Sequence, residues 1–85
     1  MSPRWVQVAA EVEWYEGHRR QERPIAVRFG AERLELTVER SWNVGPAEAG
    51  RPERRMFLAR AADGRRLRIR LDGQGAAGVE TEVGD

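Results

Sequence analysis

The stretch MFLARAADGRRLRIRL, residues 56–71, decides the fold of this chain. Bulky apolar residues alternate with arginine or alanine on both sides of Asp63-Gly64. This alternation is typical of β-strands, because successive strand side chains point to opposite faces. An Asp-Gly pair between two such runs predicts a hairpin with a two-residue type I′ turn. The mostly apolar face of that hairpin would pair Arg60 with Leu67, Leu58 with Ile69 and Met56 with Leu71.

The opposite face of this hairpin holds the strongest candidate site. The same register sets Arg66, Arg68 and Arg70, here called the arginine row, about 6.6 to 6.8 Å apart along one strand. Their expected partners are Ala61, Ala59 and Phe57. The two alanines are too small to cover guanidinium groups, and the phenylalanine ring would stand beside the last arginine.

Such a surface suits a single nucleic-acid strand, because phosphates recur at a similar spacing and an exposed ring can stack on a base. We therefore predict weak nucleic-acid binding through Arg54, Arg55, Phe57, Arg66, Arg68 and Arg70. The other interpretation is a solvated sheet face on which acids of neighbouring strands, such as Glu35 or Glu39, neutralise the arginines. The net charge of only +1 favours that second interpretation, since dedicated nucleic-acid modules are usually more basic.

A second hairpin is predicted in IAVRFGAERLELTVER, residues 25–40. A two-residue Gly30-Ala31 turn of type II′ would pair Val27 with Leu34 and Ile25 with Leu36, with all four on one face. The competing helix over 31–42 would leave Leu36 on the wrong side and place Glu35 against Glu39 four residues later, which is unfavourable. The pattern therefore favours strands.

The remaining segments are assigned by the same patterns. WVQVAAEVEWY, residues 5–15, alternates throughout and predicts one half-buried strand with Trp14 facing inward. SWNVGPAEAGRPERR, residues 41–55, contains two prolines and two glycines and predicts a loop. VETEV, residues 79–83, could add a short edge strand, but fraying is expected. We therefore expect a β domain over 1–72 and a flexible, acidic, glycine-rich tail over 73–85.

Five predicted strands with mostly short connections indicate an all-β, antiparallel meander. At 85 residues the chain allows one domain, and the sheet would curl into a small SH3-like or OB-like, partly open barrel, because curling removes exposed edges. The expected core consists of Val6, Val8, Val12, Trp14, Ile25, Val27, Phe29, Leu34, Leu36, Leu58, Ile69 and Leu71.

The sequence contains few residues of the types that carry out catalysis. The chain has no cysteine and a single histidine, His18, in a charged segment, and no metal-ligand spacing or phosphate-binding loop occurs. Its serine and threonine hydroxyl groups, on Ser2, Ser41, Thr37 and Thr81, have no neighbouring histidine or lysine to act as a base. We expect a protein that is not an enzyme, with no cofactor and no metal. No apolar run is long enough for a membrane span, so a cytoplasmic location is expected.

The positive charge has an unusual composition and distribution. All fifteen basic residues are arginine, a bias that a GC-rich genome explains better than selection for bidentate contacts. Residues 51–71 hold eight arginines against two acids, whereas residues 72–85 hold four acids and no base. The basic block therefore coincides with the predicted 56–71 hairpin.

Two tryptophans could contact a partner. Trp5 lies on the face opposite Trp14, and Trp42 stands at the end of a predicted strand. Exposed aromatic residues of this kind can cover a barrel mouth or anchor a protein partner. The alternative function is therefore a protein–protein interaction module or a small homodimer with no nucleic-acid role. The expected oligomeric state is a monomer or a weak homodimer.

Residues 15–72 resemble a family of short bacterial proteins of unknown function from GC-rich genomes. The matching positions are Gly17, Pro24, Phe29, Gly30, Trp42, Phe57, Asp63 and Gly64. Some proteins similar to this family are thought to be encoded near translesion-polymerase genes. The resemblance therefore implies an accessory role in DNA repair.

Overall fold

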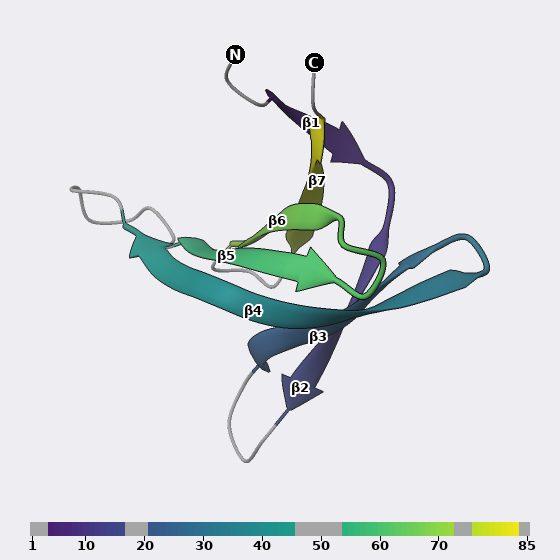
Figure 1. Cartoon of the computed structure of the whole chain (residues 1–85). Helices are drawn as coiled ribbons and strands as arrows, with labels where there is room; N and C mark the ends of the chain where they lie inside the picture. The colour runs from purple at the N-terminus through teal and green to yellow at the C-terminus, as the bar shows by residue number, and fades with distance from the viewer. Residues whose placement is uncertain (1–3, 17–20, 46–53, 73–75, 84–85) are drawn as a thin grey trace.

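The computed structural model describes residues 4–16, 21–45, 54–72 and 76–83, and these residues form an all-β fold, as predicted. All pairings are antiparallel in one sheet with the order β1-β7-β6-β5-β4-β3-β2 (Figure 1). The described segments contain seven strands where five were predicted: β1 (Arg4–Val8), β2 (Glu11–Glu16), β3 (Gln21–Phe29), β4 (Glu32–Val44), β5 (Arg54–Ala61), β6 (Arg66–Leu71) and β7 (Ala77–Val83). No helix that could cross a membrane occurs in these segments.

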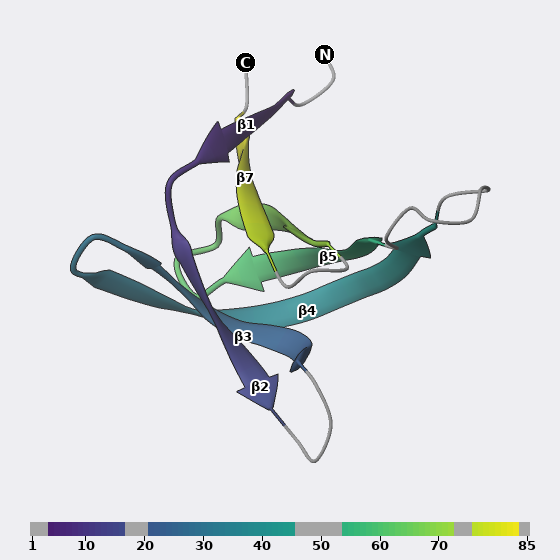
Figure 2. The same cartoon turned by 180° about the vertical axis from the view of Figure 1, so that it is seen from behind.

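The sheet curls because its two edge strands are consecutive in the chain. Only Ala9 and Ala10 separate β1 from β2, yet β1 pairs with β7 and β2 pairs with β3 at the opposite end of the strand order. The single strand predicted over 5–15 is therefore divided into two. Figures 1 and 2 show the resulting half-barrel, in which β1 and β7 rise away from the crossing pair of β2 and β3.

Strand β4 is the longest strand and changes partner along its length. Its first residues pair with β3, and residues from Leu36 to Val44 pair with β5, with a register shift between Val38 and Arg40. The loop predicted over 41–55 is wrong at both ends, because Ser41–Val44 continue the ladder of β4 and pair with residues of β5 that include Arg54 and Arg55. Backbone pairing with β5 outweighs the weak strand propensity of this segment, because each paired residue satisfies its amide and carbonyl groups. Residues 46–53 lie outside the described part.

The hairpin of β3 and β4 confirms the predicted two-residue turn. Gly30 has a φ of 61°, and Val27 pairs with Leu34 as expected. The predicted pair of Ile25 and Leu36 does not form, because the β3–β4 ladder ends with Ala26 opposite Glu35. The β2–β3 ladder also omits Ile25, at a register shift, and Leu36 lies opposite Ala61 of β5.

The hairpin of β5 and β6 forms with a register different from the predicted one. Its loop consists of Ala62, Asp63 and Gly64, and the amide of Gly64 donates to the carbonyl of Ala61 at 2.9 Å. Among the described residues only glycines have positive φ, with 92° at Gly64, so the type I′ turn, which needs two such residues, is excluded. A type I turn followed by a glycine bulge fits these bonds.

This change of register reverses the two faces of β5. Phe57 lies opposite Ile69 and Ala59 lies opposite Leu67, and all four are buried. Trp14 packs edge-on against Phe57, with ring centroids 5.6 Å apart. The predicted register is wrong because it would have placed Phe57 outside and Arg60 against the apolar face.

The core is otherwise close to the predicted one. It centres on Val27, Leu34, Phe57, Ala61, Leu67, Ile69, Leu71 and Val79, with Val8, Ala10, Val12, Trp14, Phe29, Leu36 and Val38 packed against it. Three predicted core residues depart from this arrangement. Val6 is 42% exposed, Leu58 is half-buried on the other face of β5, and Ile25 is half-buried beside a register shift in the β2–β3 ladder.

The segment expected to fray is part of the sheet. Strand β7 lies between β1 and β6, and Val79 is only 2% exposed. The prediction of a flexible tail is therefore wrong for residues 77–83; residues 73–75 and 84–85 lie outside the described part. The physical reason is that β7 provides backbone partners for two strands at once, which the local sequence does not reveal.

Candidate nucleic-acid interface

The arginine row lies on the outward face, the side of the sheet opposite the core. Arg66, Arg68 and Arg70 stand opposite Arg60, Leu58 and Met56 respectively. The predicted common face of the arginine row is therefore present, but its neighbours on β5 are not the alanines and phenylalanine that the sequence suggested. Met56 and Leu58 supply apolar surface beside the guanidinium groups.

Two of the predicted site residues belong to the opposite face. Phe57 is 1% exposed, so it cannot stack on a base. Arg55 pairs with Leu71 on the inward side, with its guanidinium 5.2 Å from the Phe57 ring centroid. Arg54 lies on the outward face opposite Val44. The two adjacent arginines therefore do not act together.

Carboxylates of the same sheet hold two members of the arginine row. Arg68 Nε donates to Glu80 Oε1 at 2.7 Å, and the Trp5 ring lies 4.8 Å from the Arg68 guanidinium. Arg66 lies 3.5 Å from a carboxylate oxygen of Glu39 and 3.9 Å from one of Glu82. Much of the positive charge at this end of the row is therefore neutralised internally.

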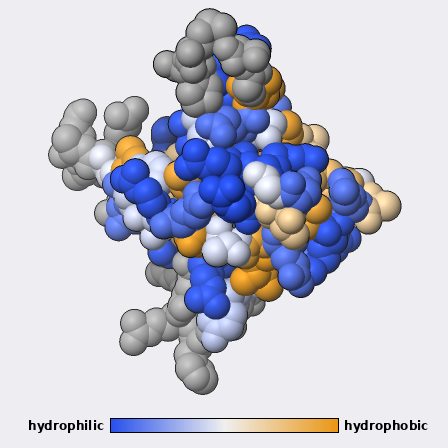
Figure 3. All heavy atoms as spheres, viewed as in Figure 1, coloured by the Kyte–Doolittle hydropathy of each residue, from blue (hydrophilic) through white to orange (hydrophobic). Residues whose placement is uncertain are grey.

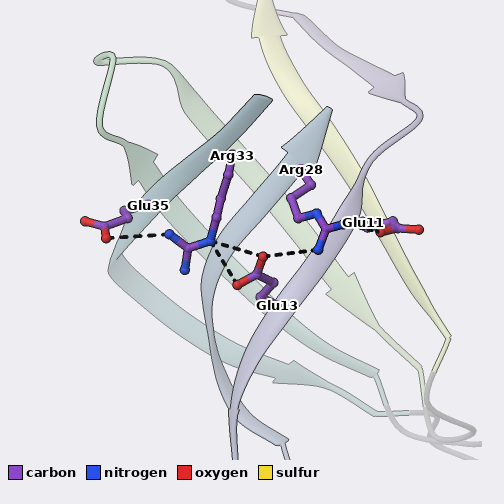
Figure 4. A network of polar contacts seen from close by, with 5 residues as sticks. All are labelled: Glu11, Glu13, Arg28, Arg33 and Glu35. Carbon is purple, nitrogen blue, oxygen red and sulfur yellow. Dashed lines mark hydrogen bonds and ion pairs between the residues drawn. The ribbon is translucent and has the colours of Figure 1, made fainter. Parts of the chain in front are cut away.

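The outward face of β2, β3 and the first part of β4 carries a separate ion-pair network, shown in Figure 4. Glu13 lies 3.7 Å from Arg28 and 3.0 Å from Arg33. Glu11 extends the network from Arg28 at 3.9 Å, and Glu35 extends it from Arg33 at 3.6 Å. Glu35, named in the sequence as a possible partner of the arginine row, therefore contacts Arg33 instead.

The third region of the outward face combines an exposed tryptophan with arginines. We call it the tryptophan patch, and it consists of Arg40, Trp42, Val44, Arg54, Met56 and Arg70. Trp42 is 38% exposed and Val44 is 44% exposed, and the Arg40 guanidinium lies 5.5 Å from the Trp42 ring centroid. In Figure 3 the middle of the visible face is mainly hydrophilic, with smaller hydrophobic areas between the charged groups.

The arginines of the tryptophan patch differ from those at the other end of the row. Within the described segments, Arg40, Arg54 and Arg70 make no ion pair with a carboxylate. Their positive charge is therefore not balanced by a carboxylate within the described segments, in contrast to that of Arg66 and Arg68.

Other candidate groups are placed without forming a site. Ser41 and Thr37 lie on β4 and Thr81 lies on β7, while His18 and Ser2 fall outside the described residues. In the described ranges no three residues of the types His, Cys, Asp and Glu are grouped to hold a metal ion.

Sequence reasoning missed Arg40, Val44 and Met56. The alternation of Arg40, Trp42 and Val44 is visible in the sequence, but the glycine and prolines that follow suggested a loop. Met56 is placed on the mostly apolar face by the predicted register, whereas the observed register places it on the outward face. Comparisons of the chain with protein-family models, with curated proteins and with solved structures find no match. The description of the tryptophan patch therefore rests on this chain.

Proposed function

We propose that this protein is a non-catalytic binding module that contacts single-stranded nucleic acid through the tryptophan patch. The observation that carries the proposal is the position of Trp42, exposed on the sheet among three arginines that make no ion pair in the described structure. Each nucleotide of a single strand offers a base with a flat apolar face, and the backbone carries a charged phosphate on either side of it. An exposed ring with arginines around it matches that combination.

The tryptophan patch extends over three neighbouring strands, which suits a few nucleotides. Trp42 and Arg70 both lie opposite Met56, one on each side of β5, so two strand spacings of about 4.8 Å separate their backbones. Base stacking on an aromatic ring contributes about 1–3 kcal/mol. Three phosphate contacts would give a slope of about −2 for log affinity against log salt, at roughly 0.7 per contact. Binding is therefore expected to be weak and strongly salt-dependent.

Single strands are favoured over duplexes because the bases of a duplex are already stacked on one another. A base reaches Trp42 only when it is not held in a helix. The resemblance stated for residues 15–72 is consistent with an accessory role in DNA repair, where single strands are exposed.

A protein partner is the second candidate, and the exposed apolar residues favour it. Trp42, Val44 and Tyr15 are all at least 38% exposed, and tryptophan and tyrosine are common anchors of protein interfaces. A second copy of the chain is one form of this candidate. Apolar contacts respond little to salt, so salt dependence separates the two functions.

Fluorescence anisotropy of a labelled oligothymidine at low salt tests the proposal. Trp42→Ala should weaken binding by about 1–3 kcal/mol, the contribution of one stacked base. Arg54→Ser should make the salt slope shallower by about 0.7. Arg28→Ser is the matched control, because it removes the same charge from the network of Figure 4, away from the patch.

Three results would count against the proposal. One is the absence of binding to the oligothymidine at low salt, and another is an equal loss of affinity in Arg54→Ser and Arg28→Ser. The third is binding that does not change with salt, which would favour a protein partner. Circular dichroism of each variant confirms that the fold is retained, since all three side chains lie on the outward face.

A further inference from the structure

Strand β7 presents two glutamates and a glycine to the arginine row. Arg68 lies opposite Glu80, Arg70 lies opposite Gly78, and Arg66 contacts Glu82. Along the row the facing residues are thus an acid, a second acid and a glycine. The difference between Arg68 and Arg70 therefore originates in β7, while Arg66 also contacts Glu39 of β4.

The contact between Arg68 and Glu80 is the strongest of these pairs by geometry. The bond of 2.7 Å is short and part-buried, and charge-assisted bonds of this length are stronger than neutral ones. The Trp5 ring lies 4.8 Å from the same guanidinium. Glu80 therefore neutralises Arg68 and weakens its attraction for a phosphate.

Arg66 has two acidic neighbours. Glu39 and Glu82 lie 3.5 and 3.9 Å from its terminal nitrogens. Glu39 also accepts a hydrogen bond from Arg60 Nε at 3.0 Å. Losing one acid would therefore leave Arg66 partly neutralised.

Arg70 is arranged differently because its neighbour has no side chain. A Cβ placed on Gly78 would lie 2.9 Å from Arg70 Nη2, 3.5 Å from Cζ and 3.7 Å from Nε. The guanidinium therefore lies against the backbone of β7, in space that any other residue at position 78 would occupy. Gly78 thus permits the observed position of Arg70, beside Met56 and on the same face as Trp42.

We propose that β7 determines which arginines the nucleic acid contacts. Glu80 and Glu82 serve as built-in counter-ions of Arg68 and Arg66, and Gly78 positions Arg70 for a phosphate. The inference rests on the proposed function and deepens it, because it restricts the ligand to the few nucleotides that the tryptophan patch can hold. Glu80 is accordingly a specificity-determining residue and Gly78 a positioning residue.

The test compares the affinity and salt slope of labelled oligothymidine for the full chain and three variants. Glu80→Gln should release Arg68 to a further phosphate, tightening binding and making the slope steeper by about 0.7. Gly78→Ala should displace Arg70 and make the slope shallower by about 0.7 without changing the net charge. Glu35→Gln is the charge-matched control for Glu80→Gln, because it removes an acid that contacts Arg33 in the separate network.

The outcomes separate the two proposals. If the unmodified chain binds and Glu80→Gln behaves like Glu35→Gln, the role of β7 is overturned while the proposed function stands. An unchanged slope in folded Gly78→Ala overturns the positioning role. If only Glu80→Gln binds, the tryptophan patch is not the site, yet Glu80 is confirmed as the residue that blocks Arg68. If no form binds, both proposals fail.

Discussion

Phe57 and Met56 are neighbours in the chain with opposite environments. Phe57 is 1% exposed, faces Ile69 and contacts Trp14. Met56 is half-buried on the outward face between Trp42 and Arg70. A register shifted by one residue would exchange these environments, because side chains alternate along a strand. The stability of variants at these two positions therefore measures the register directly.

We expect Phe57→Ala to lower the free energy of unfolding by about 3–5 kcal/mol, because it leaves a cavity in the core. Met56→Ala should cost about 1 kcal/mol or less, as is usual for a residue of the outward face. Urea denaturation followed by tryptophan fluorescence measures both. If Phe57→Ala does not fold, Phe57→Leu keeps the comparison, since its cavity is smaller. A larger loss for Met56→Ala than for either Phe57 variant would contradict the observed register.

Strand β7 has more than one role in the sheet. It is the partner of both β1 and β6, and β1 has no other strand beside it in the described structure. Val79 contributes to the core from the middle of this strand. The outward side of the same strand carries the acids that contact Arg66 and Arg68. One short segment thus contributes to the core, the sheet and the charge pattern.

Removing residues 77–85 is therefore expected to unfold the protein. The deletion removes Val79 from the core and leaves β1 and the outer side of β6 without backbone partners. A chain that ends at Val83 is the control, because it retains all of β7. Far-ultraviolet circular dichroism and urea denaturation compare the two. A cooperative transition in the chain lacking 77–85 would show that β7 is dispensable.

At the scale of the molecule, the curl of the sheet follows from chain connectivity. Strands β1 and β2 occupy opposite ends of the strand order and are joined through two alanines. The first and last strands pair with each other, with Arg4 opposite Val83. The ends of the described chain therefore lie side by side. New termini elsewhere should thus be compatible with the same sheet.

A circular permutant tests this arrangement. A short glycine-serine linker joins residue 85 to residue 1, and the chain is opened between Gly30 and Ala31, in the turn that connects β3 with β4. We expect a β-type circular dichroism spectrum. The loss of stability should be small, because the entropy of loop closure changes by only about 0.6 kcal/mol per doubling of loop length. The control is opened between Val79 and Glu80, within β7, and should not fold. Equal behaviour of the two permutants would contradict the described topology.

Local features of this protein are predictable from its sequence. The period of two along the chain predicted an all-β fold, and the glycine turn predicted the pairing of Val27 with Leu34. The inward position of Trp14 and the shared face of the arginine row also followed from alternation. These features depend on a residue and its near neighbours, which is why they were accessible without a structure.

The tertiary structure decided the partners and the register. Both strands of a hairpin alternate in the same way, so alternation does not distinguish a two-residue loop from a three-residue loop. The three-residue loop is the one observed, and it places Phe57 in the core. The division of β1 from β2 and the inclusion of β7 depend on backbone pairing with strands far away in the chain. The neutralisation of Arg66 and Arg68 has the same origin, because Glu39, Glu80 and Glu82 reach them only after the sheet has formed.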